Sequence, residues 1–256
     1  MMNFFENLNP IYQALIAGLM TFGITALGSS CVFLFKKINK NIMNILLSIS
    51  AGIMLSSSFF SLINPAIENA SKIGQIPYII SPIGIILGCI VLFICDKIYM
   101  KKNKKKINSL ILSITLHNIP EGMAIGIAFG AAKYGIGEST VISALMLALG
   151  IGIQNFPEGS AISFPLFKDG YSKFKAFLIG ALSAIVEPVA ALLGAILVIK
   201  AQMILPIMLS FAAGAMLYVT VVELIPESMA SKNKEHMALY LVIGFIIMMM
   251  LDVALG

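Results

Sequence analysis

Long apolar segments alternate with short polar connections along the whole chain. Each segment holds roughly 20 mostly apolar residues, the length that an α-helix needs to cross the hydrocarbon of a bilayer. Lys, Asn, Pro and Gly mark the connections between them. The pattern predicts eight helical spans, at residues 11–35, 42–64, 78–99, 108–132, 139–165, 174–199, 203–225 and 236–255.

The composition agrees with this pattern. Of the 256 residues, 59% are hydrophobic and only 11% are charged, and the mean hydropathy is +0.98, far above that of soluble domains. We therefore expect an all-α integral membrane protein that forms a single transmembrane domain over residues 1–256. The net charge of +5 does not indicate a nucleic-acid partner, because the lysines gather at the ends of the spans.

The lysines also predict the orientation of the chain. Eight crossings place both termini on the same side of the membrane. The odd-numbered connections carry thirteen lysines and the even-numbered ones carry three, and the chain has no arginine. The positive-inside rule then puts the odd-numbered connections in the cytoplasm. We expect a multi-pass protein of the cell membrane with both termini on the extracytoplasmic side.

A hexapeptide with a glutamate and a proline occurs twice within these apolar spans. His117-Asn118-Ile119-Pro120-Glu121-Gly122 lies in the fourth span, and Gln154-Asn155-Phe156-Pro157-Glu158-Gly159 lies in the fifth. A carboxylate in the membrane is costly, and a proline removes a helix hydrogen bond. Their repetition in neighbouring spans indicates a shared polar site.

A second repeat relates spans two and seven. Ala51-Gly52-Ile53-Met54-Leu55 leads to Leu62-Ile63-Asn64-Pro65, and Ala213-Gly214-Ala215-Met216-Leu217 leads to Leu224-Ile225-Pro226, with one residue fewer. The two spans are an odd number of crossings apart and run in opposite directions, as do spans four and five. This is the pattern of an inverted-topology repeat. It predicts a 3+2+3 arrangement, in which two three-helix bundles flank a central helix pair.

Within each motif, the polar side chains project from one face of the helix that carries it. Span six adds a third carboxylate, Glu187, beside Pro188. No lysine lies deep enough in a span to pair with the three glutamates, so they must be protonated, hydrogen-bonded or facing a cation. A purely structural role and a proton relay remain open alternatives. The mixture of imidazole, carboxylate and amide oxygen favours a divalent metal ion such as Zn, Fe, Mn or Cd.

Other functions fit the sequence less well. An intramembrane metal-dependent hydrolase would need more imidazole ligands, and the chain has no His-Glu-x-x-His motif. We therefore expect no enzyme activity. A passive metal channel that uses the same residues is an alternative that motifs cannot separate from a carrier. Met54 is either a packing residue or a soft ligand.

The paired motifs, together with Glu187-Pro188, resemble those of the ZIP (Zrt/Irt-like) family of divalent metal transporters. Gln154 in the second motif, Ala51-Gly52-Ile53-Met54, and Glu223-Leu224-Ile225-Pro226-Glu227 are similar to the GufA-like branch. The resemblance covers all eight spans. It implies an eight-helix 3+2+3 fold, a homodimer, and alternating access that carries zinc into the cytoplasm, with Cd, Fe and Mn as further possible cargo.

The resemblance also implies a binuclear metal site between helices four and five, where the metal is cargo and no cofactor is needed. One ion would meet His117, Glu121, Gln154 and Glu158, with Met54 nearby. The second ion would meet Asn118, Glu121, Asn155, Glu158 and Glu187. Some relatives have Asp at the position of Asn155, so the second site of this chain is expected to be less negative and weaker.

Overall fold

Every regular element that the structure describes is helical. The computed structural model describes residues 5–34, 39–102, 106–133, 140–200, 202–231 and 233–255, without the side chains of residues 99–102, 106–114, 116, 117, 199, 200, 202 and 255. The eight expected spans correspond to α2 (Pro10–Leu34), α3 with η1 and α4 (Lys40–Ser57, Ser58–Ile63, Asn64–Lys72), α5 (Pro77–Lys102), α6 (Lys106–Ala132), α7 (Val141–Lys168), α8 with α9 (Lys173–Leu182, Val186–Lys200), α10 with η3 and α11 (Leu205–Val219, Thr220–Leu224, Ile225–Ser228), and α12 (Lys234–Leu255). A short 3₁₀ turn, η2 (Gln202–Ile204), precedes α10.

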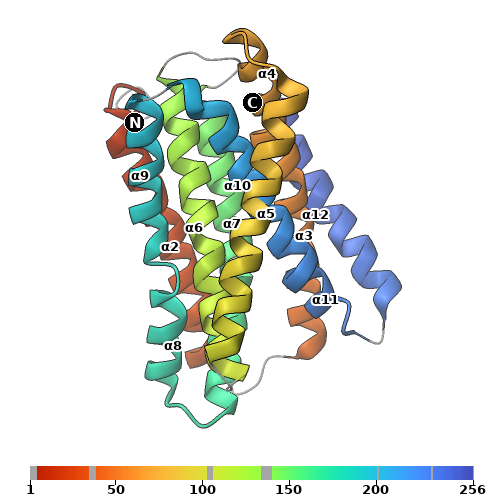
Figure 1. Ribbon diagram of the computed structural model, residues 1–256. Coiled ribbons are helices and arrows are strands. Elements are labelled where there is room, and N and C mark those ends of the chain that lie inside the picture. The colour runs from red at the N-terminus through yellow and green to blue at the C-terminus, as the bar shows by residue number, and fades with distance from the viewer. Residues whose placement is uncertain are drawn as a thin grey trace.

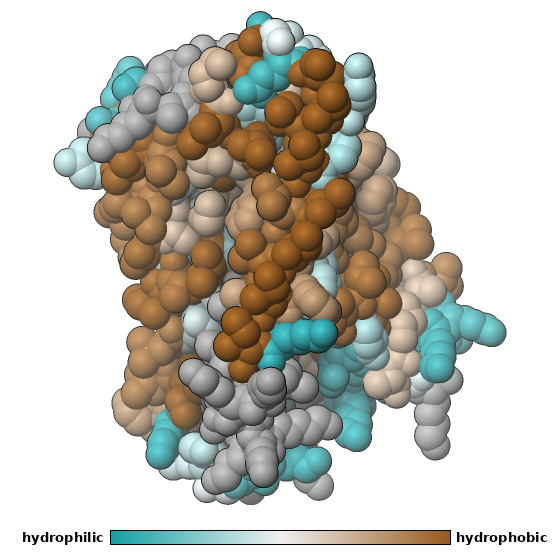
Figure 2. Space-filling view, viewed as in Figure 1, coloured by the Kyte–Doolittle hydropathy of each residue, from teal (hydrophilic) through white to brown (hydrophobic). Residues whose placement is uncertain are grey.

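The outer surface suits a bilayer. Seven of the helical stretches searched in the described ranges are long and apolar enough to cross a membrane, and α6, with 27 residues, runs beside them as the eighth long helix. Apolar side chains cover most of the visible face, and polar side chains gather toward its two ends (Figure 2). The prediction of an all-α membrane protein is confirmed.

Side-chain caps begin several helices where the sequence leaves the apolar pattern. Thr140 precedes α7 and forms a capping box: its hydroxyl accepts a bond from the Ser143 N–H at 3.0 Å, and the Ser143 hydroxyl accepts one from the Thr140 N–H at 2.9 Å. Asn39 and Ser172 cap α3 and α8 more simply, since each side chain accepts one bond, from the N–H of Asn41 and of Lys175 respectively. These caps satisfy N–H groups that a helix start otherwise leaves without partners.

Three of the spans are not regular α-helices. Spans two and seven each contain a π-helical segment, η1 and η3, that ends two residues before a proline. In these segments the Asn64 N–H bonds to the Phe59 carbonyl and the Ile225 N–H to the Thr220 carbonyl, so each turn holds an extra residue. Span six is divided by a turn at residues 183–185. None of these interruptions is evident from hydropathy.

The helices form two groups in space (Figure 1). The most extensive contacts are those of α6 with α9, α2 with α7, α10 with α5, and α12 with α3. One group therefore contains α2, α6, α7, α8 and α9, and we call it the motif group because it holds both hexapeptides. The other, which we call the flanking group, contains α3, α5, α10 and α12. The 3+2+3 order describes the repeat along the chain, and in space spans one and six pack against the central helices, so the two halves interleave.

Matching contacts support the inverted repeat. A Cβ on Gly52 would overlap the Leu241 carbonyl oxygen, and a Cβ on Gly214 would overlap that of Ile85. The two glycines occupy corresponding positions of the repeat in α3 and α10, and they meet α12 and α5 respectively. Ser58 in turn bonds the Met54 carbonyl at 2.7 Å, as Thr220 bonds that of Met216 at 2.8 Å. Span two therefore packs against span eight as span seven packs against span three.

Candidate metal centre

Helices α6 and α7 carry the two hexapeptides, with Pro120 and Pro157 inside them. Six of the polar residues expected at the site are 3% exposed or less, and they come from α6, α7 and α9: Asn118, Glu121, Gln154, Asn155, Glu158 and Glu187. His117 belongs to α6, but its side chain lies outside the described residues. The structure therefore buries the expected donors without placing the imidazole.

The amides of α7 bond to two other helices of the motif group. The Gln154 Nε2 donates to Glu121 Oε1 of α6 at 2.7 Å. The Asn155 Nδ2 donates to Glu187 Oε1 of α9 at 2.9 Å. Consecutive residues of one helix thus orient two carboxylates that come from different spans, and hydrogen bonds to charged groups are among the stronger ones.

These bonds leave oxygen atoms available. An amide that gives its N–H to a carboxylate still has its carbonyl oxygen as an acceptor. Among the described residues, buried side-chain oxygens without a hydrogen-bond partner include Gln154 Oε1, Asn155 Oδ1, Glu121 Oε2 and Glu187 Oε2, and neither polar atom of the Asn118 amide is bonded. Buried polar atoms are normally satisfied, so such a cluster needs an explanation. A bound cation is one partner that would satisfy these oxygen atoms.

The three glutamates of the site influence one another. Glu121 experiences the charges of Glu158 and Glu187, and Glu187 that of Glu158. Within the described part of the chain, no three His, Cys, Asp or Glu side chains converge closely enough to hold a metal by themselves. Among the side chains that the structure describes, a metal at this place would have the amide oxygens as ligands besides the carboxylates.

The turn in span six positions Glu187. After the helix α8 ends, Ser183, Ala184 and Ile185 form turns whose N–H groups bond carbonyls three or four residues back, and α9 then begins with Glu187 in its first turn. The N-terminus of a helix favours a negative charge. Pro188 follows at a position where its missing N–H breaks no helix bond. The local sequence thus places a carboxylate at the centre of the motif group.

Two threonines of α2 were not anticipated from the sequence. Thr21 and Thr25 are fully buried or nearly so, and their side chains face the Glu187 carboxylate. Each hydroxyl also donates to a carbonyl of its own helix at 3.1 Å, of Gly18 and Thr21 respectively. Their spacing of four residues puts them on one face of an otherwise apolar span, which was the available clue.

Met54 is buried in α3, and its sulfur accepts a hydrogen bond from the Thr220 hydroxyl at 3.6 Å. One turn earlier in α3, the Ser50 hydroxyl donates to the backbone carbonyl of Gln154 at 3.4 Å. Span two therefore approaches the site at Gln154, while the methionine sulfur is directed to span seven. Both the packing role and the ligand role of Met54 stay open.

The glycine after each glutamate allows close helix contact. A Cβ on Gly122 would overlap the Glu187 carbonyl oxygen, and a Cβ on Gly159 would overlap that of Thr25. Each motif glycine thus presses its helix against a different span of the motif group, α6 against α9 and α7 against α2. Small residues at such contacts are typical of membrane helices.

The fold and the site define a class: a multi-pass membrane protein with an inverted repeat and a buried group of oxygen donors between helices. Residues 100–252 match the family model described as ZIP zinc transporter. The chain is 34% identical to the zinc transporter ZIP11 of Xenopus tropicalis, over 98% of this chain and 99% of that one. It is 32% identical to the zinc transporter GufA of Myxococcus xanthus, over 94% and 98%, and 32% identical to the zinc transporter ZIPB of Bordetella bronchiseptica, over 98% and 84%.

The chain therefore belongs to the ZIP zinc transporter family. The resemblance to this family and to its GufA-like members is confirmed. So is the expectation that the chain is not an enzyme, since membership makes it a transporter whose substrate is a divalent metal ion.

Proposed function

We propose that this protein carries Zn²⁺ through a binuclear site between α6 and α7. The observation that supports this most strongly is the pair of bonds from Gln154 to Glu121 and from Asn155 to Glu187. These bonds orient two carboxylates and leave the amide oxygens of Gln154 and Asn155 buried without a hydrogen-bond partner. A mixed site of oxygen ligands without thiolates would release its ion more readily than a closed structural zinc site.

We assign the first ion to His117, Glu121, Gln154 and Glu158, with Met54 as a transient soft ligand. The second ion belongs to Asn118, Glu121, Asn155, Glu158 and Glu187. Glu121 and Glu158 would bridge the two ions. Cd²⁺, Fe²⁺ and Mn²⁺ suit the same donors, and competition of each against labelled Zn²⁺ uptake measures the selectivity.

Movement of the motif group against the flanking group would expose the site to one side of the membrane at a time. The four most extensive helix contacts, α6 with α9, α2 with α7, α10 with α5 and α12 with α3, all lie within a group. The contacts of α3 with α7 and of α10 with α6, which join the groups, are less extensive than these four. A carrier of this kind shows counterflow of labelled Zn²⁺ against an excess of unlabelled ion, and a passive channel does not.

Transport of zinc would be directed into the cytoplasm. Both termini of the chain would lie on the extracytoplasmic side of the membrane, as the distribution of lysines predicts. A cysteine introduced at the exposed Asn233 would then react with an impermeant reagent only after the cells are permeabilised. We also propose a homodimer, on the basis of the family resemblance. The mass of the protein in a lipid nanodisc tests that assembly.

The main test is uptake of Zn²⁺ into liposomes that contain the purified protein and an enclosed zinc indicator. Glu121→Ala and Glu158→Ala are expected to abolish uptake, because each removes the carboxylate assigned to both ions. Glu235→Ala is the control, since Glu235 is exposed at the start of α12. Undiminished uptake in both site variants, with the helical content of the wild type, would contradict the site.

A further inference from the structure

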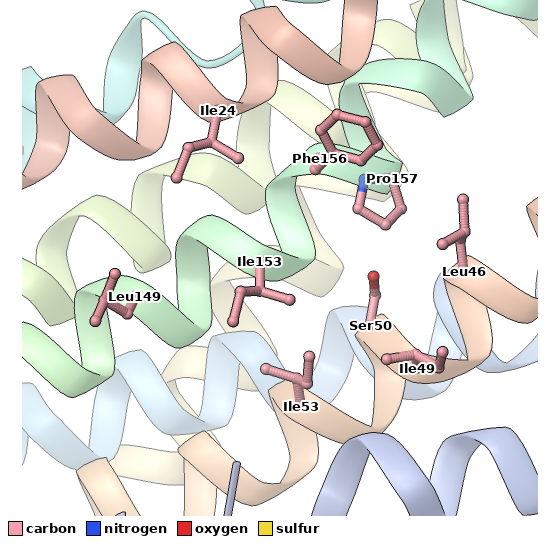
Figure 3. Close-up of a pocket in the computed structure, with 9 residues that line it drawn as sticks. All are labelled: Ile24, Leu46, Ile49, Ser50, Ile53, Leu149, Ile153, Phe156 and Pro157. Atoms are coloured by element: carbon pink, nitrogen blue, oxygen red, sulfur yellow. The ribbon is translucent and has the colours of Figure 1, made fainter. Parts of the chain in front are cut away.

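An apolar groove of about 380 Å³ lies between α2, α3 and α7 (Figure 3). Its volume is within the range of pockets that bind small molecules. By helical spacing, the α7 residues that line the groove lie on the opposite face of α7 from Gln154, Asn155 and Glu158. Ile24 comes from α2, and the remaining lining residues come from α3 and α7. The groove therefore crosses the boundary between the motif group and the flanking group.

The groove is elongated along the helices. Leu46, Ile49, Ser50 and Ile53 form a stripe on one face of α3, and Leu149, Ile153 and Phe156 form a stripe on α7 that faces it. Seven residues of an α-helix span about 10 Å. The space between the stripes therefore has the shape of a stretched hydrocarbon chain rather than of a compact ligand.

The lining offers no free polar group. Eight of the nine lining residues are apolar. The exception is Ser50, whose hydroxyl donates to the backbone carbonyl of Gln154. A metal ion or a polar ligand would lose its hydration here without compensation, whereas a hydrocarbon ligand would not.

The groove opens on the surface that faces lipid. Leu149, Ile153 and Phe156 are 39%, 47% and 38% exposed, and they lie near the middle of the 28-residue helix α7. At that depth the surroundings of the protein are acyl chains. The groove is thus continuous with the surface that already contacts lipid.

A cation lies one leaflet away, at the start of α3. Lys40, the first residue of α3, is exposed and precedes Ser50 by about 15 Å of helix. Half of the hydrocarbon thickness is also about 15 Å. A lipid whose chain reaches the groove would therefore hold its headgroup near Lys40, where an anionic headgroup is favoured.

We propose that the groove binds an acyl chain of an anionic phospholipid from the leaflet in which Lys40 lies. The bound chain fills the space between α3 and the helices α2 and α7, and so stabilises the arrangement of the two groups seen in this structure. Control of the transport rate by this lipid rests on the proposed function, but the binding does not.

The chain has no tryptophan, so one introduced tryptophan reports on a single place. Phe156→Trp puts the reporter in the groove. Phe59→Trp is the control, because Phe59 is a 48% exposed aromatic residue of span two that lies nine residues beyond Ser50 and outside the groove. Both proteins are placed in phosphatidylcholine vesicles that contain a minor fraction of phosphatidylglycerol with brominated acyl chains, which quench tryptophan on contact.

We expect the brominated lipid to be enriched about five-fold at the groove reporter relative to the control, which corresponds to about 1 kcal/mol for one lysine at an anionic surface. Lys40→Gln in the reporter background should remove this enrichment. Equal quenching of the two reporters in proportion to the lipid composition would overturn the proposal.

A second variant closes the groove. Ile49→Phe introduces the side chain that Phe211, the corresponding residue of the repeat in α10, already has. In the reporter background it should reduce quenching to the level of the control. Without the reporter, it should make Zn²⁺ uptake independent of phosphatidylglycerol. Unchanged groove quenching by Ile49→Phe contradicts the binding, whereas absence of uptake in the wild type contradicts only the transport function.

Discussion

The two copies of the hexapeptide differ in how their amides are used. In α7, Gln154 and Asn155 both donate to carboxylates of neighbouring helices. In α6, the Asn118 amide is buried without a hydrogen-bond partner, although it corresponds to Asn155 in the repeat. The copy in α7 therefore organises the site and would also bind metal, while Asn118 is assigned only to binding. Sequence similarity alone hides this division.

Removing an organising amide should have the largest effect. Gln154→Ala deletes a proposed ligand and the donor to Glu121. We expect the affinity for Zn²⁺ to fall about 10- to 100-fold, as when the groups that orient metal ligands are removed. Titration of the purified protein with Zn²⁺ measures this change.

Asn118→Ala is the matched comparison for Asn155→Ala. Both should weaken metal binding, but only Asn155→Ala breaks an interhelical bond, so it alone should lower the free energy of unfolding, by about 1–3 kcal/mol. Thermal unfolding of the metal-free proteins distinguishes them. An equal loss of stability in both would show that the two copies are used in the same way.

The motif glycines should affect stability in a similar way in both copies. Gly122→Ala and Gly159→Ala each add a Cβ against a carbonyl of another helix, and such overpacking costs about 1–3 kcal/mol. Gly23→Ala in α2 is the control because its Cβ would meet nothing within 4 Å. If all three variants unfold at the wild-type temperature, the helices are less tightly packed than the structure indicates.

Asn155→Asp should strengthen the weaker of the two proposed ion sites. The substitution adds a negative charge and removes the donor to Glu187, so carboxylates face each other when no metal is bound. We expect about tenfold tighter binding of the second ion, or about 1.4 kcal/mol, together with a lower unfolding temperature of the metal-free protein. A rise in metal-free stability would contradict this reasoning.

Met54→Leu should have the smallest effect. The side chains have similar volumes, and such exchanges cost less than about 1.5 kcal/mol of stability. If the sulfur contacts the ion during transport, the variant loses Cd²⁺ uptake more than Zn²⁺ uptake, because cadmium prefers softer ligands. Equal effects on both ions would assign Met54 to packing.

Much of the architecture could be predicted from the sequence because hydropathy and the cost of buried charge act locally. The eight spans agree with the observed helices to within a few residues except at the end of span two, where α4 continues to Lys72. The structure places Glu121 beside Gln154 and Glu187 beside Asn155, all of them residues singled out by the motifs and by Glu187-Pro188, and their role as metal ligands stays a prediction.

Interactions between distant spans could not be predicted in this way. The turn before Glu187, the π-helical segments and the two helix groups depend on how glycines and prolines of one span meet the backbone of another. The threonines Thr21 and Thr25 were missed because hydroxyls that bond their own helix are common in apolar spans. The imidazole of His117 remains a prediction from the motif alone.

Anomalous diffraction at the zinc edge, from crystals of the protein grown with Zn²⁺, tests the central claim most directly. The account predicts zinc peaks between α6 and α7, within bonding distance of the carboxylates of Glu121 and Glu158 and of amide oxygens from Gln154 or Asn155. The peak that includes Asn155 should have the lower occupancy. Zinc peaks found only elsewhere, in a protein that transports Zn²⁺, would contradict it.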